Sequence, residues 1–266
     1  MICFGTLTEA AHTRLPFHLD GKLLSHKSHL IVAPDNDPAS PNAFLIEQEP
    51  GAFLGVHFHG NAQFQVVVAG DGTLGPHALR PVTVHYAGQR TAYGPILPGP
   101  QGLWYLTLRP RYEAGAYFMP QSRDLRDPAI KRREVFGATL ETAGRDGVAN
   151  CGAVTTLDAV IVPQGDGLAA WIMRLPAGMA GQAPATPASS GRYHVVLGGS
   201  FEHAGHSLDW LSTVWADAEE PGLAVRAGAS GLELLILEFP ADATAHDLPG
   251  VKPTAVLATR EGLCST

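Results

Sequence analysis

The chain has 266 residues, enough for one large domain or for two domains of ordinary size. Hydrophobic residues make up 45% of it and charged residues 16%, so it can bury a core and we expect little disorder. The formal net charge is −7 with only 18 lysines and arginines. A nucleic-acid partner needs a basic surface, so the composition argues against this class of partner.

The cysteines and the first residues of the chain indicate the cellular compartment in which we expect the protein. Cys3, Cys151 and Cys264 are far apart and odd in number, which predicts no disulfide framework and a reducing compartment. The first residues show no signal-peptide pattern, and no apolar run approaches the ~18 residues of a membrane helix. We therefore expect a cytoplasmic protein without a membrane partner.

Short apolar runs, and not long helical periodicity, dominate the chain from beginning to end. In chain order they cover residues 43–46, 64–69, 82–86, 103–108, 154–162, 169–175, 193–197 and 232–239. Each run is bounded by Gly, Pro, Asp or Asn, as is typical of strands joined by tight turns. The pattern predicts an all-β sandwich or barrel.

An internal repeat relates the two halves. Residues 102–108 resemble residues 231–237 at an offset of 129 (231 − 102), and residues 63–70 fall on residues 192–199 at the same offset. A run ahead of these, at 43–46, matches 170–173 at an offset of 127 (170 − 43). Three matches in the same order indicate two copies of one fold, which we expect at residues 1–120 and 121–266.

The densest functional signal is the run GVHFHGNAQFQVVVAG in the first copy. On a strand His57 and His59 point to the same face, because side chains alternate. A turn at the following Gly-Asn would return the chain so that Gln63 and Gln65 face the same space. Two imidazoles and an oxygen donor can hold a first-row transition metal and leave positions open for a substrate.

This run resembles the first motif of the cupin superfamily, in which a glycine, an HxH pair, a glutamate and a second glycine follow one another. His57, His59 and Gly70 match the motif, and Gln63 stands where the glutamate would be. The resemblance implies two tandem cupin-like double-stranded β-helix (jelly-roll) barrels with the site inside the barrel. It also implies a divalent transition metal, of which Fe(II) is our first expectation and Zn, Mn and Ni are alternatives.

The second cupin motif, a PxG turn followed by a histidine, is incomplete here. Pro98 and Gly99 fit the turn, but no histidine follows them as far as residue 104. We expect His85 to join His57, His59 and Gln63 as a metal ligand, with His77 or water as alternatives. An amide in place of a carboxylate removes one negative charge, so the metal should be bound more weakly.

Three further side chains are candidates for contact with a substrate, namely Gln65, Arg90 and Tyr93. Arg90 could clamp a carboxylate, and an aromatic ring such as that of Tyr93 could support a planar substrate. The structural alternative is that each packs in the barrel without a role in function, and that the histidine pair is a hydrogen-bonded polar patch.

The second copy lacks strong metal ligands where the HxH strand should fall. Residues 181–190 read GQAPATPASS, and their prolines argue against a central strand. Arg192 and His194 occupy the positions of Gln63 and Gln65. We expect this copy to act as a scaffold or dimerisation module, and the protein to be a homodimer.

Two functions remain open from the sequence. The first is a metal-dependent cupin enzyme acting on a small organic or aromatic acid, with a dioxygenase, an isomerase and a lyase all compatible with the fold. The alternative is a non-catalytic bicupin with a decayed metal site, which binds a small molecule or is purely structural. The missing histidine favours the alternative, and the intact HxH pair opposes it.

Overall fold

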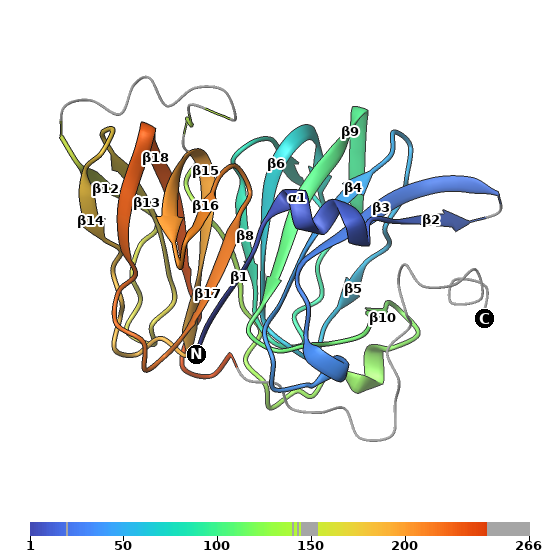
Figure 1. Cartoon of the computed structure of the whole chain (residues 1–266). Helices are drawn as coiled ribbons and strands as arrows, with labels where there is room; N and C mark the ends of the chain where they lie inside the picture. The colour runs from blue at the N-terminus through green and yellow to red at the C-terminus, as the bar shows by residue number, and fades with distance from the viewer. Residues whose placement is uncertain (20, 140, 143, 145–153, 244–266) are drawn as a thin grey trace. The chain divides into compact units, whose positions relative to one another are not determined.

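The computed structural model of the chain (Figure 1) describes residues 1–19, 21–139, 141–142, 144 and 154–243. Cys151 and Cys264 lie outside these residues. Strands dominate, which confirms the all-β prediction. The described chain divides into two compact units, one formed by Ala11–Phe136 and the other by Met1–Ala10 with Gly137–Asp242. No helix in the described part of the chain is long and apolar enough to cross a membrane.

The first unit, Ala11–Phe136, is a β-barrel that we call the first barrel. Its strands are β2 (Leu15–Leu19), β3 (Lys22–Ile31), β4 (Asn42–Gln48), β5 (His57–Phe58), β6 (Gln63–Leu74), β7 (His77–Leu79), β8 (Val84–Ala87), β9 (Ile96–Arg109), β10 (Tyr117–Phe118) and β11 (Glu134–Phe136). The large sheet has the order β11-β8-β6-β9-β4-β3-β2, with β7 paired to β6, and a small sheet pairs β10 with β5. Three short 3-10 helices cover Ala11–Thr13, Pro34–Asn36 and Arg123–Leu125.

The second unit, which we call the second barrel, holds the remaining elements. They are β1 (Ile2–Gly5), α1 (Leu7–Ala10), β12 (Thr156–Ile161), β13 (Ala169–Leu175), β14 (Ala180–Gln182), β15 (Gly191–His203), β16 (His206–Leu208), β17 (Thr213–Asp217) and β18 (Ala224–Glu238). Its sheet has the order β1-β17-β15-β18-β13-β12, with β14 paired to β18 and β16 to β15.

The internal repeat is present in the strand pairing as well as in the sequence. The β6–β9 register shifts between Val67 and Ala69, and the β15–β18 register shifts between Val196 and Gly198, which is the same irregularity 129 residues later (196 − 67). A second shift follows in both pairs. Such bulges bend a strand at a defined point, so the two barrels curve by the same device.

The N-terminal strand differs from the predicted domain division. Residues 1–10 were expected within the 1–120 barrel, but β1 pairs antiparallel with β17, placing Cys3 opposite Trp215. Phe4 packs against the apolar core of the second barrel, which explains the pairing. The compact units accordingly meet in sequence at 10/11 and at 136/137 instead of at 120/121.

The two barrel interiors differ in chemistry. The core of the second barrel is apolar, with Val196, Leu234 and Ile236 among its buried residues. Of residues 181–190, Gly181 and Gln182 belong to the short strand β14, and residues 183–190, which hold the prolines, form no strand. In the first barrel an apolar core that includes Phe44 and Tyr105 lies beside a group of buried polar side chains. The second barrel also buries Arg192, His194 and Glu238, but the buried polar side chains of the first barrel include those that line a cavity.

Candidate functional site

A cavity of about 790 Å³ opens into the first barrel. Aromatic and aliphatic side chains form much of its wall, namely Phe17, Leu24, Phe44, Ile46, Phe53, Leu54 and Phe118. The polar side chains that line it include Lys27, His57, His59, Gln63, Gln65, Tyr93, Thr107, Arg109 and Glu113. This is the size and composition expected of a small-molecule pocket.

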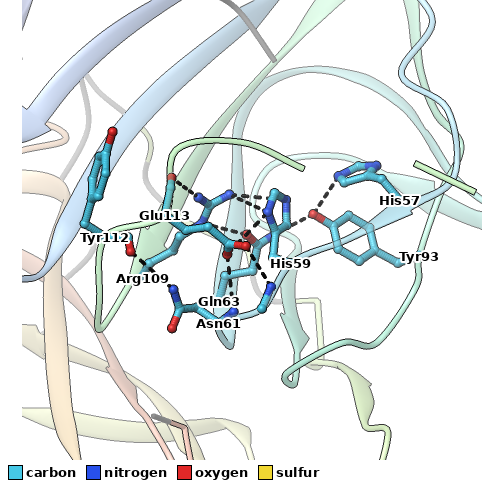
Figure 2. Close-up of polar contacts among 9 residues, drawn as sticks. His57, His59, Asn61, Gln63, Tyr93, Arg109, Tyr112 and Glu113 are labelled. Carbon is cyan, nitrogen blue, oxygen red and sulfur yellow. Dashed lines mark hydrogen bonds and ion pairs between the residues drawn. The ribbon is translucent and has the colours of Figure 1, made fainter. Parts of the chain in front are cut away.

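The two histidines of the HxH pair, His57 on β5 and His59 directly after it, line this cavity with ring centroids 5.3 Å apart. Figure 2 shows that His57 meets the hydroxyl of Tyr93, at 2.9 Å from its Nε2. The amide nitrogen of Gln63 donates to the same hydroxyl at 2.6 Å. A β-bridge between His57 and Tyr93 fixes the approach of these two residues.

Arg109, the last residue of β9, inserts its guanidinium beside this group (Figure 2). Its Nε donates to Oε1 of Gln63 at 3.0 Å, and one terminal nitrogen lies 3.2 Å from both ring nitrogens of His59. The other terminal nitrogen donates to the carbonyl of Glu113 at 3.0 Å. Only 4% of Arg109 is exposed, so a buried cation stands at the centre of the polar cluster.

A series of hydrogen bonds runs from Arg109 to the carbonyl of Gly55, and the groups at its two ends determine the direction of each bond. A guanidinium can only donate, so Gln63 accepts from Arg109 through its oxygen and donates to Tyr93 through its nitrogen. At the other end the carbonyl of Gly55 can only accept, so Nδ1 of His57 donates to it at 2.7 Å. The Tyr93 hydroxyl then donates to Nε2 of His57, and every group in the series is satisfied.

Glu113 holds the turn that follows β5. Its two carboxylate oxygens accept from the backbone amides of Gly60 at 2.8 Å and Asn61 at 3.2 Å, and one of them lies 3.7 Å from His59 Nδ1. Burial raises the pKa of Glu113, while the Arg109 cation and the two amides act in the opposite direction. The carboxylate thus shapes the loop that carries the histidine pair.

The electrostatics of the cluster keep the imidazoles neutral. Burial lowers the pKa of His57 to about 4. Burial, and after it the Arg109 cation, lowers the pKa of His59 well below its usual value. Burial raises the pKa of Tyr93, so its hydroxyl keeps the proton that it donates.

Solved structures with the same architecture cover most of the chain. Oxalate decarboxylase from Lactobacillus farciminis, in a formate complex, is 12% identical with a TM-score of 0.55 over 85% of this chain and 86% of that one. The chain has a cupin fold. Pirin YhhW from Escherichia coli in complex with nickel(II) is 14% identical (TM-score 0.54, 90% of this chain and 99% of that one). AerE from Microcystis aeruginosa is 15% identical (TM-score 0.53, 89% and 98%). No family model and no curated protein matches the sequence.

The cupin fold raises the question of whether these residues fit a metal ion. Among the described residues, no three His, Cys, Asp or Glu side chains gather so that they could hold one. Nε2 of His57 already accepts from Tyr93, and the oxygen of Gln63 already accepts from Arg109. A fixed guanidinium beside His59 would also repel a divalent cation. In this arrangement the donor set does not fit a metal.

His85 and His77, the other predicted ligands, do not line the cavity, although the His85 ring lies 5.2 Å from that of Tyr93. His85 is buried, and its ring nitrogens contact Gln65 at 2.9 Å and Glu134 at 3.0 Å, while Gln65 itself lines the cavity. His77 is exposed at the β7 end and stacks on Phe136 with ring centroids 4.0 Å apart. The structure therefore brings together His57, His59 and Gln63 without His77 or His85.

Of the three residues predicted to contact a substrate, two line the cavity and one does not. Tyr93 and Gln65 line the cavity, whereas Arg90 is not among the lining residues. The backbone amide of Arg90 donates to the carbonyl of His59 at 2.8 Å, and its guanidinium lies 3.7 Å from Asp127. Arg90 thus contacts the HxH strand through its backbone.

Sequence reasoning missed Arg109, Glu113 and Lys27. Arg109 ends β9 opposite Asn42 of β4, and the pairing of β9 with β6, in which Leu108 faces Phe64, brings it to Gln63. Lys27 lies on β3 opposite Ile46, with its ammonium 3.9 Å from the ring centroid of Phe44. The one available signal was Arg109 directly after an apolar run, which predicts a buried charge but not its partner.

Proposed function

We propose that the first barrel binds a small organic carboxylate with an apolar body, and that Arg109 and Lys27 recognise it without a metal as intermediary. The observation that carries this proposal is the imbalance of charge in the cavity lining. Lys22, Lys27 and Arg109 line it, against the single carboxylate of Glu113.

Glu113 interacts electrostatically with Arg109, but its carboxylate forms no ion pair with Lys27 in the described ranges. Its carboxylate oxygens are engaged by the backbone of Gly60 and Asn61, and Arg109 contacts its carbonyl oxygen. Lys27 forms no ion pair with any carboxylate in the described ranges. A carboxylate that enters the cavity would supply the missing negative charge, and charge-assisted hydrogen bonds to it are about twice as strong as neutral ones.

The walls favour a ligand that is apolar away from its carboxylate. Phe44 lies under both cations, with Lys27 Nζ 3.9 Å and the Arg109 guanidinium carbon 5.5 Å from its ring centroid. The remaining wall includes Phe17, Ile46 and Phe118. Burying an apolar body against these side chains contributes roughly 25 cal/mol per Å² removed from water.

Titration calorimetry with matched ligands tests the proposal. Phenylacetate and phenylacetamide have the same ring and nearly the same shape, but only the first carries a charge. We expect phenylacetate to bind at least about tenfold more tightly, since a charged hydrogen bond contributes about 1.5–3 kcal/mol. Equal affinity for the acid and the amide, or no binding of either, would contradict it.

A metal-dependent enzyme acting on an organic or aromatic acid is the second candidate. It is supported by the His57–His59 pair at 5.3 Å and by the nickel(II) complex of the structurally similar pirin. It requires that Arg109 leave Gln63 and His59. Metal analysis of untagged protein decides between the two: stoichiometric iron, nickel, manganese or zinc that is lost in His57→Ala supports the enzyme.

A homodimer in the cytoplasm remains a prediction, and sedimentation tests the dimer.

A further inference from the structure

Lys27 is a cavity lysine whose side chain is largely withdrawn from water. It lies on β3, half-buried, and lines the cavity with its ammonium above Phe44. In the part of the chain that the structure describes, it has no carboxylate ion-pair partner. A lysine in such a place can bind an anion when it is protonated, or act as a nucleophile when it is neutral.

Burial and a neighbouring cation disfavour the charged form of Lys27, whereas the Phe44 ring beneath its ammonium favours it. Burial lowers its pKa to about 7, and the neighbouring Arg109 cation adds to this effect. His29 on the same strand and His59, directly after β5, also interact with its charge, and both have lowered pKa values, so they are neutral at pH 7. Near neutral pH, Lys27 therefore carries a free amine far more often than an ordinary lysine, which is almost wholly protonated.

Lys22 offers a natural comparison on the same strand. It lines the same cavity, but it is exposed, and its Nζ donates to the carbonyl of Gly51 at 3.4 Å. Both lysines can meet the same ligand, but only Lys27 combines desolvation with an adjacent cation. That combination activates a lysine as a nucleophile.

We propose that Lys27 is a nucleophile that forms an imine with short oxo acids bound in the cavity. The inference rests on the proposed function, because Arg109 would hold the carboxylate of the oxo acid. The amine nitrogen adds to the carbonyl carbon, and the carbonyl oxygen then leaves as water together with the two amine protons. A C=N bond replaces the C=O bond, and the step needs no oxidant or reductant.

Reductive trapping tests this directly on the wild-type chain. Phenylpyruvate with sodium cyanoborohydride should convert the imine into a stable amine, seen as one added reduced ligand per chain by intact mass. Peptide mapping should place it on Lys27 at least tenfold above Lys22 at pH 7. The trapping rate should rise through a pH near 7 and level off above it.

Two controls separate this inference from the proposed function. Phenyllactate has the carboxylate and the ring but no ketone, so it should bind and should slow trapping by competition. Lys22→Met should keep the adduct, and Lys27→Met should lose it. Phenyllactate binding without any Lys27 adduct, or equal labelling of Lys22 and Lys27, would overturn the imine and leave anion binding intact. Failure of phenyllactate to bind would overturn the proposed function itself.

Discussion

Arg109 and Gln63 are joined by a hydrogen bond of 3.0 Å in which the guanidinium donates to the amide oxygen. The same amide donates from its nitrogen to Tyr93 at 2.6 Å. A glutamate at position 63 could accept from Arg109 but could not donate to the tyrosine. The amide that departs from the cupin motif is therefore the residue that a metal-free cluster requires.

Removing the guanidinium should affect stability and binding together. In Arg109→Met the oxygen of Gln63 and the carbonyl of Glu113 lose their donor, and an unsatisfied buried group costs about 1–3 kcal/mol. We expect a lower free energy of unfolding in denaturant titrations and a tenfold to hundredfold weaker binding of phenylacetate, on the order of one charged hydrogen bond. Arg111→Met, two residues further on and outside the cavity lining, is the matched control. Equal loss in both variants would contradict the role of Arg109.

Three substitutions at the polar cluster should together create a metal site. We expect Gln63→Glu, Tyr93→His and Arg109→Ala together to bind nickel(II) or manganese(II) at least about tenfold more tightly than the wild type, because a carboxylate and an imidazole replace an amide and a phenol. Calorimetry with the metal alone measures this. A triple variant that folds, as circular dichroism would show, yet gains no affinity would contradict our account of why the native set does not fit a metal.

His194 in the second barrel should make stability depend on pH. It is fully buried, and burial, with Arg192 second, lowers its pKa to about 3. Because the unfolded chain binds the proton more readily, stability is complete above about pH 6.5 and falls as the pH drops toward 3. His194→Leu should flatten this slope between pH 6.5 and 4 in thermal melts. The exposed His12→Leu should leave the slope as it is, and an unchanged slope in both would contradict the prediction.

Replacing either of the glycines at the repeated bulges by alanine should lower the stability of the protein to a similar extent. Gly70 and Gly199 have φ values of 72° and 68°, and a Cβ on Gly70 would collide with the carbonyl of Gly102. We expect Gly70→Ala and Gly199→Ala each to lower stability by about 1–2 kcal/mol from the backbone alone. The control is Gly165→Ala, where a Cβ meets nothing within 4 Å. A Gly70→Ala protein as stable as this control would contradict the bulge argument.

The all-β fold and the repeat could be predicted because they depend on local patterns. Alternation places His57 and His59 on one face, and the following turn brings Gln63 to them, all within a few residues. Arg109 contacts Gln63 across 46 residues, and no local pattern reports which strands pair. The substitution of Gln63 was visible in the sequence, but its physical reason was not, because the partner that requires an amide lies on another strand.

The pairing of β1 with β17 has a consequence for dividing the gene. A fragment that starts at residue 137 would lack an edge strand, and the backbone groups of Thr213–Asp217 that face Ile2–Gly5 would be open to strands of other molecules. To express that half alone, the first ten residues should be grafted onto it through a designed linker. The amino-terminal segment thus covers the sheet edge of a unit that is encoded more than a hundred codons downstream.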